Sequence, residues 1–337
     1  MNEDVSKITE LINLAIGDRA IYGASFSLVD PKQCETQYIG TQGEQNDAIP
    51  LKPGMLYDLA SLTKVVGTTT RILQLLTEHR LKLTDQIGQF VSGLREPQLT
   101  IEQLLLHTSG LPADLPAVIG LDRTQLVNAV KKTALASATG SQTIYSDLNF
   151  ILLGWVIKEI DGDLAESFQK YIFLPLKMQN TGFNLHRNDL AQFVPTEYKP
   201  ERGTIVRGEV HDEKAFILGG VSGHAGLFST LDDLSHFVQM LEQNGLYEGK
   251  QVLSPTAMEL LRKYHHSGRT LGWDLWPTST PQELKIWHTG FTGTSIAIDL
   301  VHKTGFICLT NHIYPTRKNT KWFAWRKKAV ESFFEHK

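Results

Sequence analysis

The sequence contains little cysteine, no long apolar run and no basic block, and each absence removes a class of protein. Its 337 residues include two cysteines, Cys34 and Cys308, which lie far apart and in no CxxC spacing. This pattern excludes a cysteine-rich zinc site and a disulfide framework, and it fits a reducing compartment. No apolar run reaches the length that spans a bilayer, and lysine and arginine are scattered at a net charge of −3. We therefore expect neither a membrane nor a nucleic acid as a partner.

The first 20 residues also lack the features of a signal peptide. Acidic residues stand where a signal peptide carries lysine or arginine. The apolar residues Ile8, Leu11, Ile12 and Ala15 recur at helical spacing instead of forming one block. We interpret the segment as an amphipathic helix of the fold and expect a cytoplasmic protein.

Strands are expected near both ends of the chain, with helices between them. Alternating aliphatic and aromatic residues indicate strands at about residues 20–30, 35–42, 294–301 and 305–311, and a final helix at about 320–335. We predict an α/β (α+β) fold in which an antiparallel sheet is built from the N- and C-terminal strands, is flanked by helices and carries an inserted all-helical subdomain. Residues 1–337 then form one unit, with an α/β part at 1–80 and 250–337 and a mainly helical part at 81–249. A cleft between these two parts is the expected place for a ligand site.

Three helix starts in the middle of the chain carry a capping residue with a fitting partner. The pairs are Thr100 with Gln103, Thr230 with Asp233, and Ser254 with Pro255 at the first helical position. We expect a helix to begin at each of them.

The stretch SLTK places Ser61 and Lys64 three residues apart at the start of an apolar helix, which we expect to run through about residue 78. On a helix these side chains share a face, so the lysine amine can reach the serine hydroxyl. Serine becomes a strong nucleophile only when a base takes its proton, and a lysine whose pKa has fallen can be that base. The helix N-terminus adds backbone N–H groups that can hold a developing oxyanion. A second S-x-x-K stretch runs from Ser167 to Lys170 inside an amphipathic helix, and we interpret Ser167 as a solvated surface residue.

Two further stretches carry groups that suit the same chemistry. In IYSDLN, Tyr145 and Asp147 lie two residues apart, and a tyrosine oxygen beside a lysine ammonium can relay protons to a leaving group. In WHTGF, His288, Thr289 and Gly290 stand at the start of a predicted inner strand. Glycine at such a place lets a substrate approach the backbone and accept strand-like hydrogen bonds.

Together the three stretches resemble the motifs of the serine β-lactamase and penicillin-binding-protein family, here S-x-x-K, Y-x-[ND] and [KH]-T-G at positions 61, 145 and 288. The resemblance covers roughly residues 20–311. It is greatest to the branch that holds class C β-lactamases, DD-peptidases, D-aminopeptidases and related esterases. It implies a β-lactamase/transpeptidase-like fold and a serine hydrolase that works through an acyl-enzyme.

The resemblance also implies a role for each matching residue. Ser61 is the acylated nucleophile, and Lys64 and Tyr145 share the proton transfers. Backbone N–H groups of Ser61 and Phe291 form the oxyanion hole. The residues implied in substrate binding are Asp147, His288, Thr289, Gly290 and Phe291. No metal and no organic cofactor is implied.

Two positions depart from the family's usual pattern. His288 replaces a lysine that binds the carboxylate of penicillins and of D-Ala-D-Ala, and a histidine is mostly neutral near pH 7. Asp147 replaces an asparagine and adds a negative charge. It can also pair with Lys64 and hold it protonated, which would shift the duty of base to Tyr145. We therefore expect β-lactam hydrolysis to be slow or absent.

The stretch GEVHDEKAFILGGVSGHAGLFST resembles a branch that includes peptidoglycan-fragment amidases, which cleave the amide between N-acetylmuramic acid and its peptide. We take muropeptide amides as the leading small-molecule substrate, with a role in peptidoglycan recycling. The alternatives are a muropeptide peptidase, a broad carboxylesterase, a weak β-lactamase and a catalytically silent binding protein with this fold.

Two histidines and an acid in this stretch, and one histidine elsewhere, need a separate interpretation. The irregular spacing of His211, Asp212 and His224, without an HExxH pattern, argues against a metal site and favours structural hydrogen bonds near the cleft. We interpret His107 as a helix-end residue that the helix dipole favours.

Overall fold

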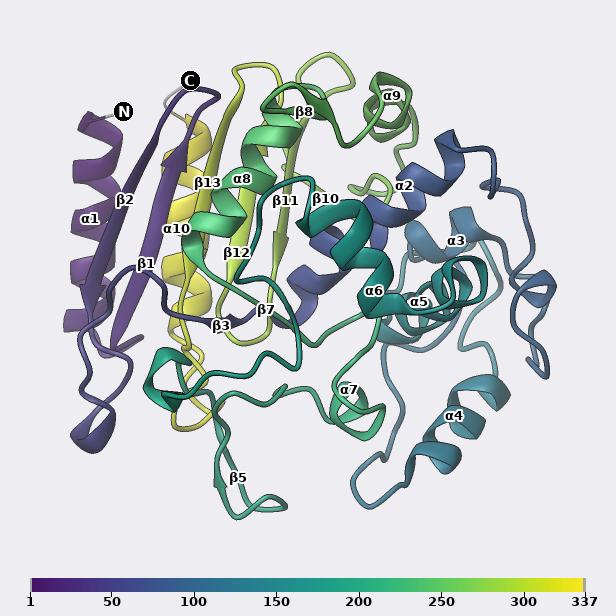
Figure 1. Cartoon of the computed structure of the whole chain (residues 1–337), viewed down its shortest axis with the longest axis horizontal. Helices are drawn as coiled ribbons and strands as arrows, with labels where there is room; N and C mark the ends of the chain where they lie inside the picture. Colours follow the sequence, from purple (N-terminus) through teal and green to yellow (C-terminus); the bar gives the residue numbers. More distant parts are fainter. Residues whose placement is uncertain (1, 336–337) are drawn as a thin grey trace.

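The computed structural model of the chain describes residues 2–335. In Figure 1 a large sheet occupies the left half of the molecule, and most of the helices lie in the right half. The helices are α1 (Asn2–Gly17), α2 (Thr70–Thr77), α3 (Ile101–Leu105), α4 (Arg123–Lys132), α5 (Asp147–Asp161), α6 (Leu164–Phe168), α7 (Glu213–Ile217), α8 (Leu231–Glu242), α9 (Pro255–Lys263) and α10 (Trp322–Glu335).

The main sheet has six strands and is antiparallel throughout. Its order is β10 (Asp274–Leu275), β11 (Lys285–Thr289), β12 (Ser295–Asp299), β13 (Thr304–Leu309), β1 (Gly23–Val29) and β2 (Cys34–Gly40). The first strand of the chain therefore pairs with the last, and Phe26 faces Cys308 across that pair. The predicted sheet built from both ends of the chain is confirmed, and each predicted strand lies within two or three residues of its expected bounds.

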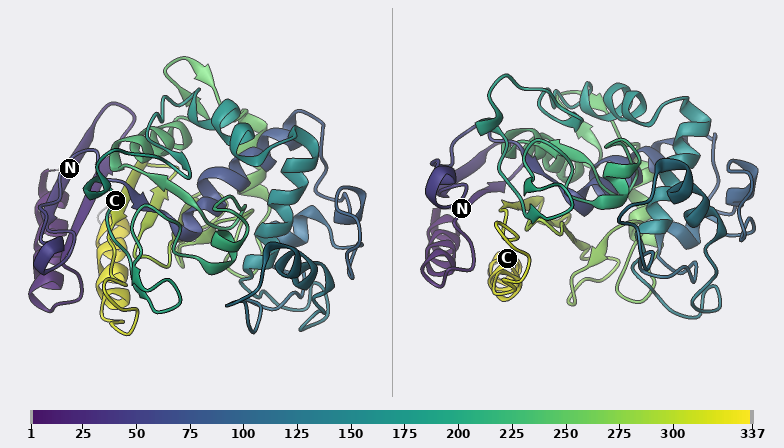
Figure 2. Two further views of the ribbon diagram at one scale, coloured as in Figure 1. Left: turned by 60° about the horizontal axis from the view of Figure 1, so that its bottom comes forward. Right: turned by 90° about the horizontal axis from the view of Figure 1, so that it is seen from below.

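Helices cover both faces of this sheet. The N- and C-terminal helices α1 and α10 pack against each other on one face, whereas α8 packs against β13 and β1 on the other (Figures 1 and 2). Every residue of β1 is buried as a result. Ile8, Ile12 and Ala15 of α1 lie in a core with Phe26 and Phe306, so the helical spacing of apolar residues near the N-terminus marked the buried face correctly.

The helical half is organised around α5, which is apolar on most of its surface and begins at Asp147. Helices α2, α3 and α6 contact it, so its first residue is held firmly inside the molecule. Helix α8 lies between residues 81 and 249 yet packs against the sheet, and the boundaries of the two parts at residues 80 and 250 stay a prediction.

The region between the terminal strands also contains short strands that the sequence did not reveal. They are β3 (Tyr57–Asp58), β7 (Leu227–Ser229) and β4 (Gly182–Phe183) in one small sheet, and the pairs β5 (Tyr198–Lys199) with β6 (Thr204–Ile205) and β8 (Leu246–Tyr247) with β9 (Lys250–Gln251). Two or three residues are too few to show an alternating pattern. The short strand β3 matters for function because it leads directly into Ser61.

The three predicted helix starts are confirmed. Thr100 and Gln103 form a reciprocal capping box at α3, Thr230 accepts from the N–H of Asp233 at α8, and Ser254 caps α9 ahead of Pro255. No helix within residues 2–335 combines the length and apolarity that crossing a membrane requires.

The interpretation of Ser167 as a surface residue was wrong. Its side chain is buried, and its Oγ donates a 2.7 Å hydrogen bond to Asp161, a carboxylate that also pairs with the buried Arg71. The hydroxyl is needed to satisfy that carboxylate, which explains a serine on the inner face of α6.

Candidate active site

Ser61 lies at the start of a helical segment that is held in an unusual conformation. Ala60 adopts a φ of +47°, which is rare for a residue with a Cβ, and the backbone turns sharply there. The Asp58 carboxylate accepts hydrogen bonds from the N–H groups of Ala60 (2.8 Å) and His211 (2.7 Å) and so stabilises the turn. Ser61 emerges from this turn partly exposed, while its neighbours are buried.

The sequence predicted a regular helix after Ser61, but the structure shows an irregular one. It begins with a 3₁₀ turn at Ala60–Leu62, continues as a π-helix at Lys64–Thr69 and becomes α-helical only in α2. A π-helical segment inside a helix is frequent at functional sites. Gly67 lies in it, and a Cβ there would come within 2.2 Å of the Phe168 ring, so close packing requires glycine.

Lys64 is fully buried beneath Ser61. Its Nζ donates to the Ser61 Oγ at 2.8 Å and to the Asp147 Oδ1 at 2.8 Å, and it lies 4.8 Å from the centre of the Tyr145 ring. Burial lowers the pKa of Lys64, but Asp147 and Tyr145 outweigh it and raise the pKa above its usual range. Lys64 is therefore an ammonium ion that donates to the serine.

Tyr145 stands between Lys64 and the end of β11, and its ring is more than a third exposed. Its ring centre lies 4.7 Å from that of His107 and 6.0 Å from that of His288. His107 is fully buried, and burial holds its pKa well below the usual value. His107 directly follows the end of α3, so its interpretation as a helix-end residue is confirmed. Its ring is neutral and packs against Tyr145, so the helix dipole does not act on a charge there.

The HTG stretch lies at the end of β11 and not at the start of a strand as expected. His288 is buried, and its Nδ1 lies 3.0 Å from the carbonyl oxygen of Thr289. Burial and the nearby charges of Arg269 and Lys64 hold the pKa of His288 well below its usual value, so this ring is neutral. The expected loss of a fixed cation at this position is therefore confirmed.

Gly290 and the residues after it hold the Ser61 segment against the end of β11. A Cβ on Gly290 would lie 2.5 Å from the carbonyl oxygen of Leu59, so only glycine fits. Thr292 donates to the carbonyl of Asp58 at 2.8 Å, and Thr294 donates to that of Leu59 at 3.1 Å. Two threonines thus tie the segment that carries Ser61 to the turn that carries Phe291. The roles of the Ser61 and Phe291 N–H groups as an oxyanion hole stay a prediction.

A charged cluster that the sequence analysis missed lies beside Lys64. The Nζ of Lys214 is 3.2 Å from the second oxygen of Asp147, 3.3 Å from Asp212 and 3.0 Å from Asp114, and His224 contacts Asp212 at 2.8 Å. These carboxylates raise the pKa of Lys214 against the effect of burial. The HDEK stretch carries no local pattern that points to this cluster, because its partners come from three other segments.

The same cluster contains the one set of side chains among the described residues that could hold a metal ion. Asp147, Asp212 and His224 each place a ligand atom within 4.8 Å of the others. The ammonium groups of Lys214 and Lys64 already contact these carboxylates, so the charge of the set is balanced without an ion. His211 and His224 make structural hydrogen bonds near the cleft, as expected.

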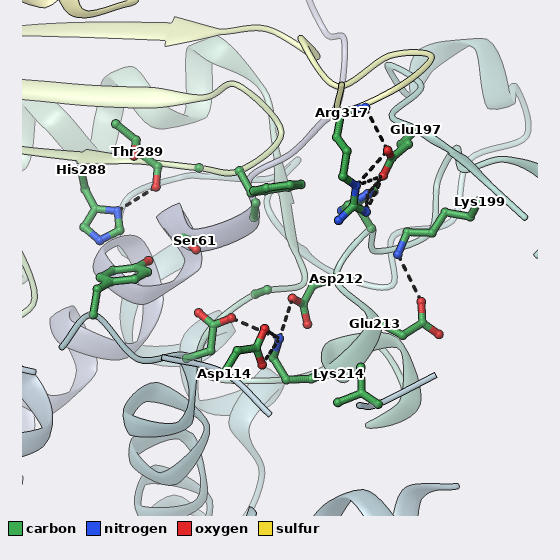
Figure 3. A pocket seen from close by; sticks show the side chains of 18 of the residues that line it. Ser61, Asp114, Glu197, Lys199, Asp212, Glu213, Lys214, His288, Thr289 and Arg317 are labelled. Carbon is green, nitrogen blue, oxygen red and sulfur yellow. Dashed lines mark hydrogen bonds and ion pairs between the residues drawn. The ribbon is translucent and has the colours of Figure 1, made fainter. Parts of the chain in front are cut away.

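All of the predicted residues meet at one cleft of about 850 Å³. Seven line its wall and Lys64 lies just beneath them; the lining residues are Ser61, Tyr145, Asp147, His288, Thr289, Gly290 and Phe291. In Figure 3, Ser61 lies between His288 on one side and the pair of Glu197 and Arg317 on the other. We call these two sides the His288 end and the Phe291 end of the cleft.

The His288 end contains Tyr145 and a cation that the sequence analysis did not find. Arg269 is buried, its guanidinium lies 5.4 Å from the centre of the Tyr145 ring, and it pairs with Asp274. Its Nε and Nη2 have no hydrogen-bond partner within residues 2–335. Asp274 pairs with this charge, and the two unpartnered donor atoms are themselves buried in the wall of the cleft.

The Phe291 end contains aromatic rings and paired charges. The ring of Phe291 stacks on His211 at 5.6 Å, and the Arg317 guanidinium lies 5.1 Å from its centre. Arg317 donates to Glu197, whose pKa is lowered to about 2 because the hydrogen bonds from His211 and Arg317 outweigh its burial.

Several known proteins are similar to this chain in sequence or in fold. The sequence matches the model of the beta-lactamase family over residues 8–331. A putative D-alanyl-D-alanine carboxypeptidase of Escherichia coli (strain K12) is 32% identical over 302 residues, which cover 77% of this chain and 69% of that protein. An N-acetylmuramyl-L-alanine amidase of Bacillus subtilis (strain 168) is 27% identical over 305 residues, with the same coverage of 77% and 69%. Among solved structures, a class C beta-lactamase has a TM-score of 0.81 at 20% identity and covers 99% of this chain and 97% of its own, which shows a common fold.

Proposed function

This chain belongs to the beta-lactamase family and is a serine hydrolase, and on that premise we propose that it cleaves the amide between N-acetylmuramic acid and the peptide in peptidoglycan fragments. Ser61 is the nucleophile in this proposal. The observation that carries it is the 2.8 Å hydrogen bond between Lys64 and Ser61 inside a cleft that also holds Tyr145. A hydroxyl, an ammonium and a phenol on one cleft are the groups that acyl transfer needs.

The protonation of Lys64 decides which group acts as base. Because Asp147 holds Lys64 as an ammonium, Lys64 has no lone pair with which to accept the proton of Ser61. We therefore assign the acceptance of the proton to the oxygen of Tyr145, whose ring centre lies 4.8 Å from the Lys64 Nζ. The proposal therefore gives Tyr145 the duty of general base and gives Lys64 an electrostatic one.

The reaction then proceeds in two steps. The Ser61 Oγ forms a bond to the substrate carbonyl as its proton passes to Tyr145, and the N–H groups of Ser61 and Phe291 hold the oxyanion. The C–N bond breaks when Tyr145 returns the proton to the leaving nitrogen, which leaves an ester on Ser61. Water attacks this ester, its proton passes through Tyr145 to the Ser61 Oγ, and the acid is released.

This assignment orients the substrate in the cleft. The leaving amine has to meet the proton on Tyr145, so the leaving group lies at the His288 end. The acyl part then extends in the other direction, past Ser61 towards the Phe291 end. For a muramoyl amide, the peptide occupies the His288 end and the sugar the Phe291 end.

The proposal is tested by incubating the protein with N-acetylmuramoyl-L-alanyl-D-glutamate and following both product and protein by mass spectrometry. We expect free N-acetylmuramic acid, and after rapid quenching an acyl group on Ser61 that Ser61→Ala lacks. Hydrolysis of p-nitrophenyl acetate without any release of N-acetylmuramic acid would instead support a carboxylesterase. Failure of a fluorophosphonate probe to label Ser61 would support a silent binding protein.

Carboxypeptidase action on a D-alanyl-D-alanine end is a second candidate. A 32% identical relative bears that name, and Arg269 on the lining of the His288 end is a cation of the kind that a terminal carboxylate requires. A muropeptide that carries both bonds separates the candidates, because release of D-alanine favours the peptidase and release of N-acetylmuramic acid favours the amidase. We also propose that the protein recycles such fragments in the cytoplasm. Cell fractionation would test this location.

A further inference from the structure

Two phenylalanine side chains are exposed on the wall of the cleft at its Phe291 end. Phe291 follows β11 and is 45% exposed, and Phe323 in the first turn of α10 is 44% exposed. The two segments are held together, since Arg326 of α10 donates to the carbonyl of Gly290 at 3.3 Å. Large apolar side chains that remain exposed on a concave surface mark a place where a ligand completes their burial.

Neighbouring side chains hold both rings in place in the absence of a ligand. His211 stacks on Phe291 with an interplanar angle of 23°, and His211 itself is held by Glu197. The Phe323 ring meets the ring of His312 edge-on at 5.1 Å and lies 5.6 Å from the Arg326 guanidinium. Because the orientations are already set, a flat ligand would bind these rings with little loss of side-chain freedom.

Around the rings lies a belt of charges in which both signs alternate. Arg317 pairs with Glu197, and Lys199 pairs with Glu213 at 3.2 Å and with Glu201 at 3.4 Å (Figure 3). An apolar acyl chain would remove these groups from water without giving them hydrogen bonds. A simple anion would meet the carboxylates of Glu197, Glu201 and Glu213 as well as the cations of Lys199, Arg317 and Arg326.

A sugar matches both features of this end. The C–H face of a pyranose is apolar and flat enough to cover an aromatic ring, and its hydroxyl groups can each donate to a carboxylate and accept from a lysine or arginine. We propose that Phe291 and Phe323 form a saccharide subsite, in which the rings bind a pyranose face and the belt of Glu197, Lys199 and Arg317 binds its hydroxyls. Its place on the acyl side of the substrate rests on the proposed function, but its binding of a sugar does not.

Sugar binding is tested on the Ser61→Ala protein, which cannot turn over substrate. Isothermal titration with N-acetylmuramic acid and with N-acetylglucosamine should show binding of both, since both carry the pyranose. Phe323→Ala, added to Ser61→Ala, should weaken binding roughly tenfold, whereas Phe323→Trp should retain it. Phe216→Ala is the matched control, because Phe216 is similarly exposed but lies outside the cleft lining.

The proposal is overturned if neither sugar binds, or if Phe323→Ala and Phe216→Ala bind them equally well. It is also overturned if D-lactate binds as tightly as N-acetylmuramic acid, because the carboxylate and not the sugar would then be recognised.

An activity measurement separates the subsite from the proposed function. N-acetylmuramoyl-L-alanine and D-lactoyl-L-alanine contain the same scissile amide, with and without the sugar. Phe323→Ala should lower the ratio of their kcat/KM values about tenfold. If the amides are cleaved and this ratio does not change, the subsite is refuted and the function stands. If no amide is cleaved while the Ser61→Ala protein binds both sugars, the function is refuted and the subsite stands.

Discussion

Lys64 donates a 2.8 Å hydrogen bond to one oxygen of Asp147, and the other oxygen of that carboxylate lies 3.2 Å from Lys214. One buried acid therefore serves two lysines. The family's usual asparagine at this position carries no charge, so the change to aspartate alters the protonation of the lysine beside the nucleophile. This relationship underlies the assignment of Tyr145 as base.

Replacing Asp147 by asparagine should change the pH profile of the enzyme. Without the carboxylate, burial lowers the pKa of Lys64, so the lysine loses its charge at a lower pH than in the native protein. We expect kcat/KM to fall roughly 10- to 100-fold near neutral pH and its alkaline limb to move to lower pH. Initial rates from pH 6 to pH 11 would measure this. An unchanged alkaline limb would contradict the pairing of Lys64 with Asp147.

Lys214→Met should destabilise the protein because it leaves the half-buried Asp147 and Asp212 without their shared cation. We expect a loss of about 3 kcal/mol in the free energy of unfolding at pH 7. Lys214 helps to keep the pKa of Asp212 well below its usual value, and a depressed carboxylate pKa stabilises the fold above the unfolded value of 3.8. The difference between variant and native protein should therefore shrink as the pH falls below about 4. Urea unfolding measures it, and the exposed Lys170→Met should show no such loss.

His312 should make the protein less stable in mild acid. Burial and then the charge of Arg326 lower the pKa of His312 from 6.5 to about 4, so the unfolded chain binds a proton that the folded chain does not. Stability is full above pH 6.5 and falls with the pH, by roughly 3 kcal/mol at pH 4. Thermal unfolding of His312→Asn should show a flatter dependence between pH 7 and pH 4.5. The exposed His186→Asn should keep the native slope, and an equal slope in His312→Asn would refute the assignment.

Gly290→Ala should damage activity far more than stability. The new Cβ would lie 2.1 Å from the Thr294 Oγ1 and 2.5 Å from the Leu59 carbonyl oxygen, so the segment that carries Ser61 has to move. A displacement of this size at a reacting group costs on the order of 100-fold in kcat/KM. Gly17→Ala meets nothing within 4 Å and is the matched control. Native activity in Gly290→Ala, measured with p-nitrophenyl acetate, would show that this contact does not position the nucleophile.

Hydrolysis of β-lactams should be slow. The ring of His288 is buried and neutral, so it offers no fixed charge to the carboxylate of a penicillin or cephalosporin. His288→Lys should raise nitrocefin turnover about tenfold, the effect of one hydrogen bond to a charged group. The absorbance change of nitrocefin measures both proteins. Turnover by the native protein at the rate of a dedicated β-lactamase would show that Arg269 already replaces the missing lysine.

Several features of the fold and site were predictable because they depend on neighbouring residues. Alternation along β1 and β13, the capping boxes and the spacing of Ser61 and Lys64 are all encoded within a few positions. The pairing of the first and last strands followed because edge-forming segments at both ends need partners. The resemblance in the three motifs added Tyr145 and His288, which no local pattern would have joined to Ser61.

The wrong predictions share a cause. Ser167 was interpreted from its position on a helix, but its side chain is buried against Asp161, whose carboxylate pairs with Arg71 from a distant segment. The helix expected after Ser61 is π-helical at Lys64–Thr69, where Gly67 packs against Phe168 from another segment. Local propensity is a weak guide wherever tertiary contacts are this dense.

The amino-acid sequence by itself determined the terminal sheet, the helix starts and the contact between Ser61 and Lys64, since short-range periodicity, capping and spacing encode them. Only the tertiary structure decided that Lys214, Arg269 and Phe323 join the cleft. Those three come from α7, from the loop before β10 and from α10, and no regular spacing connects segments that meet through long-range packing. The charge of Lys64 also depends on a long-range contact, the hydrogen bond to Asp147, and the proposed choice of base follows from that charge.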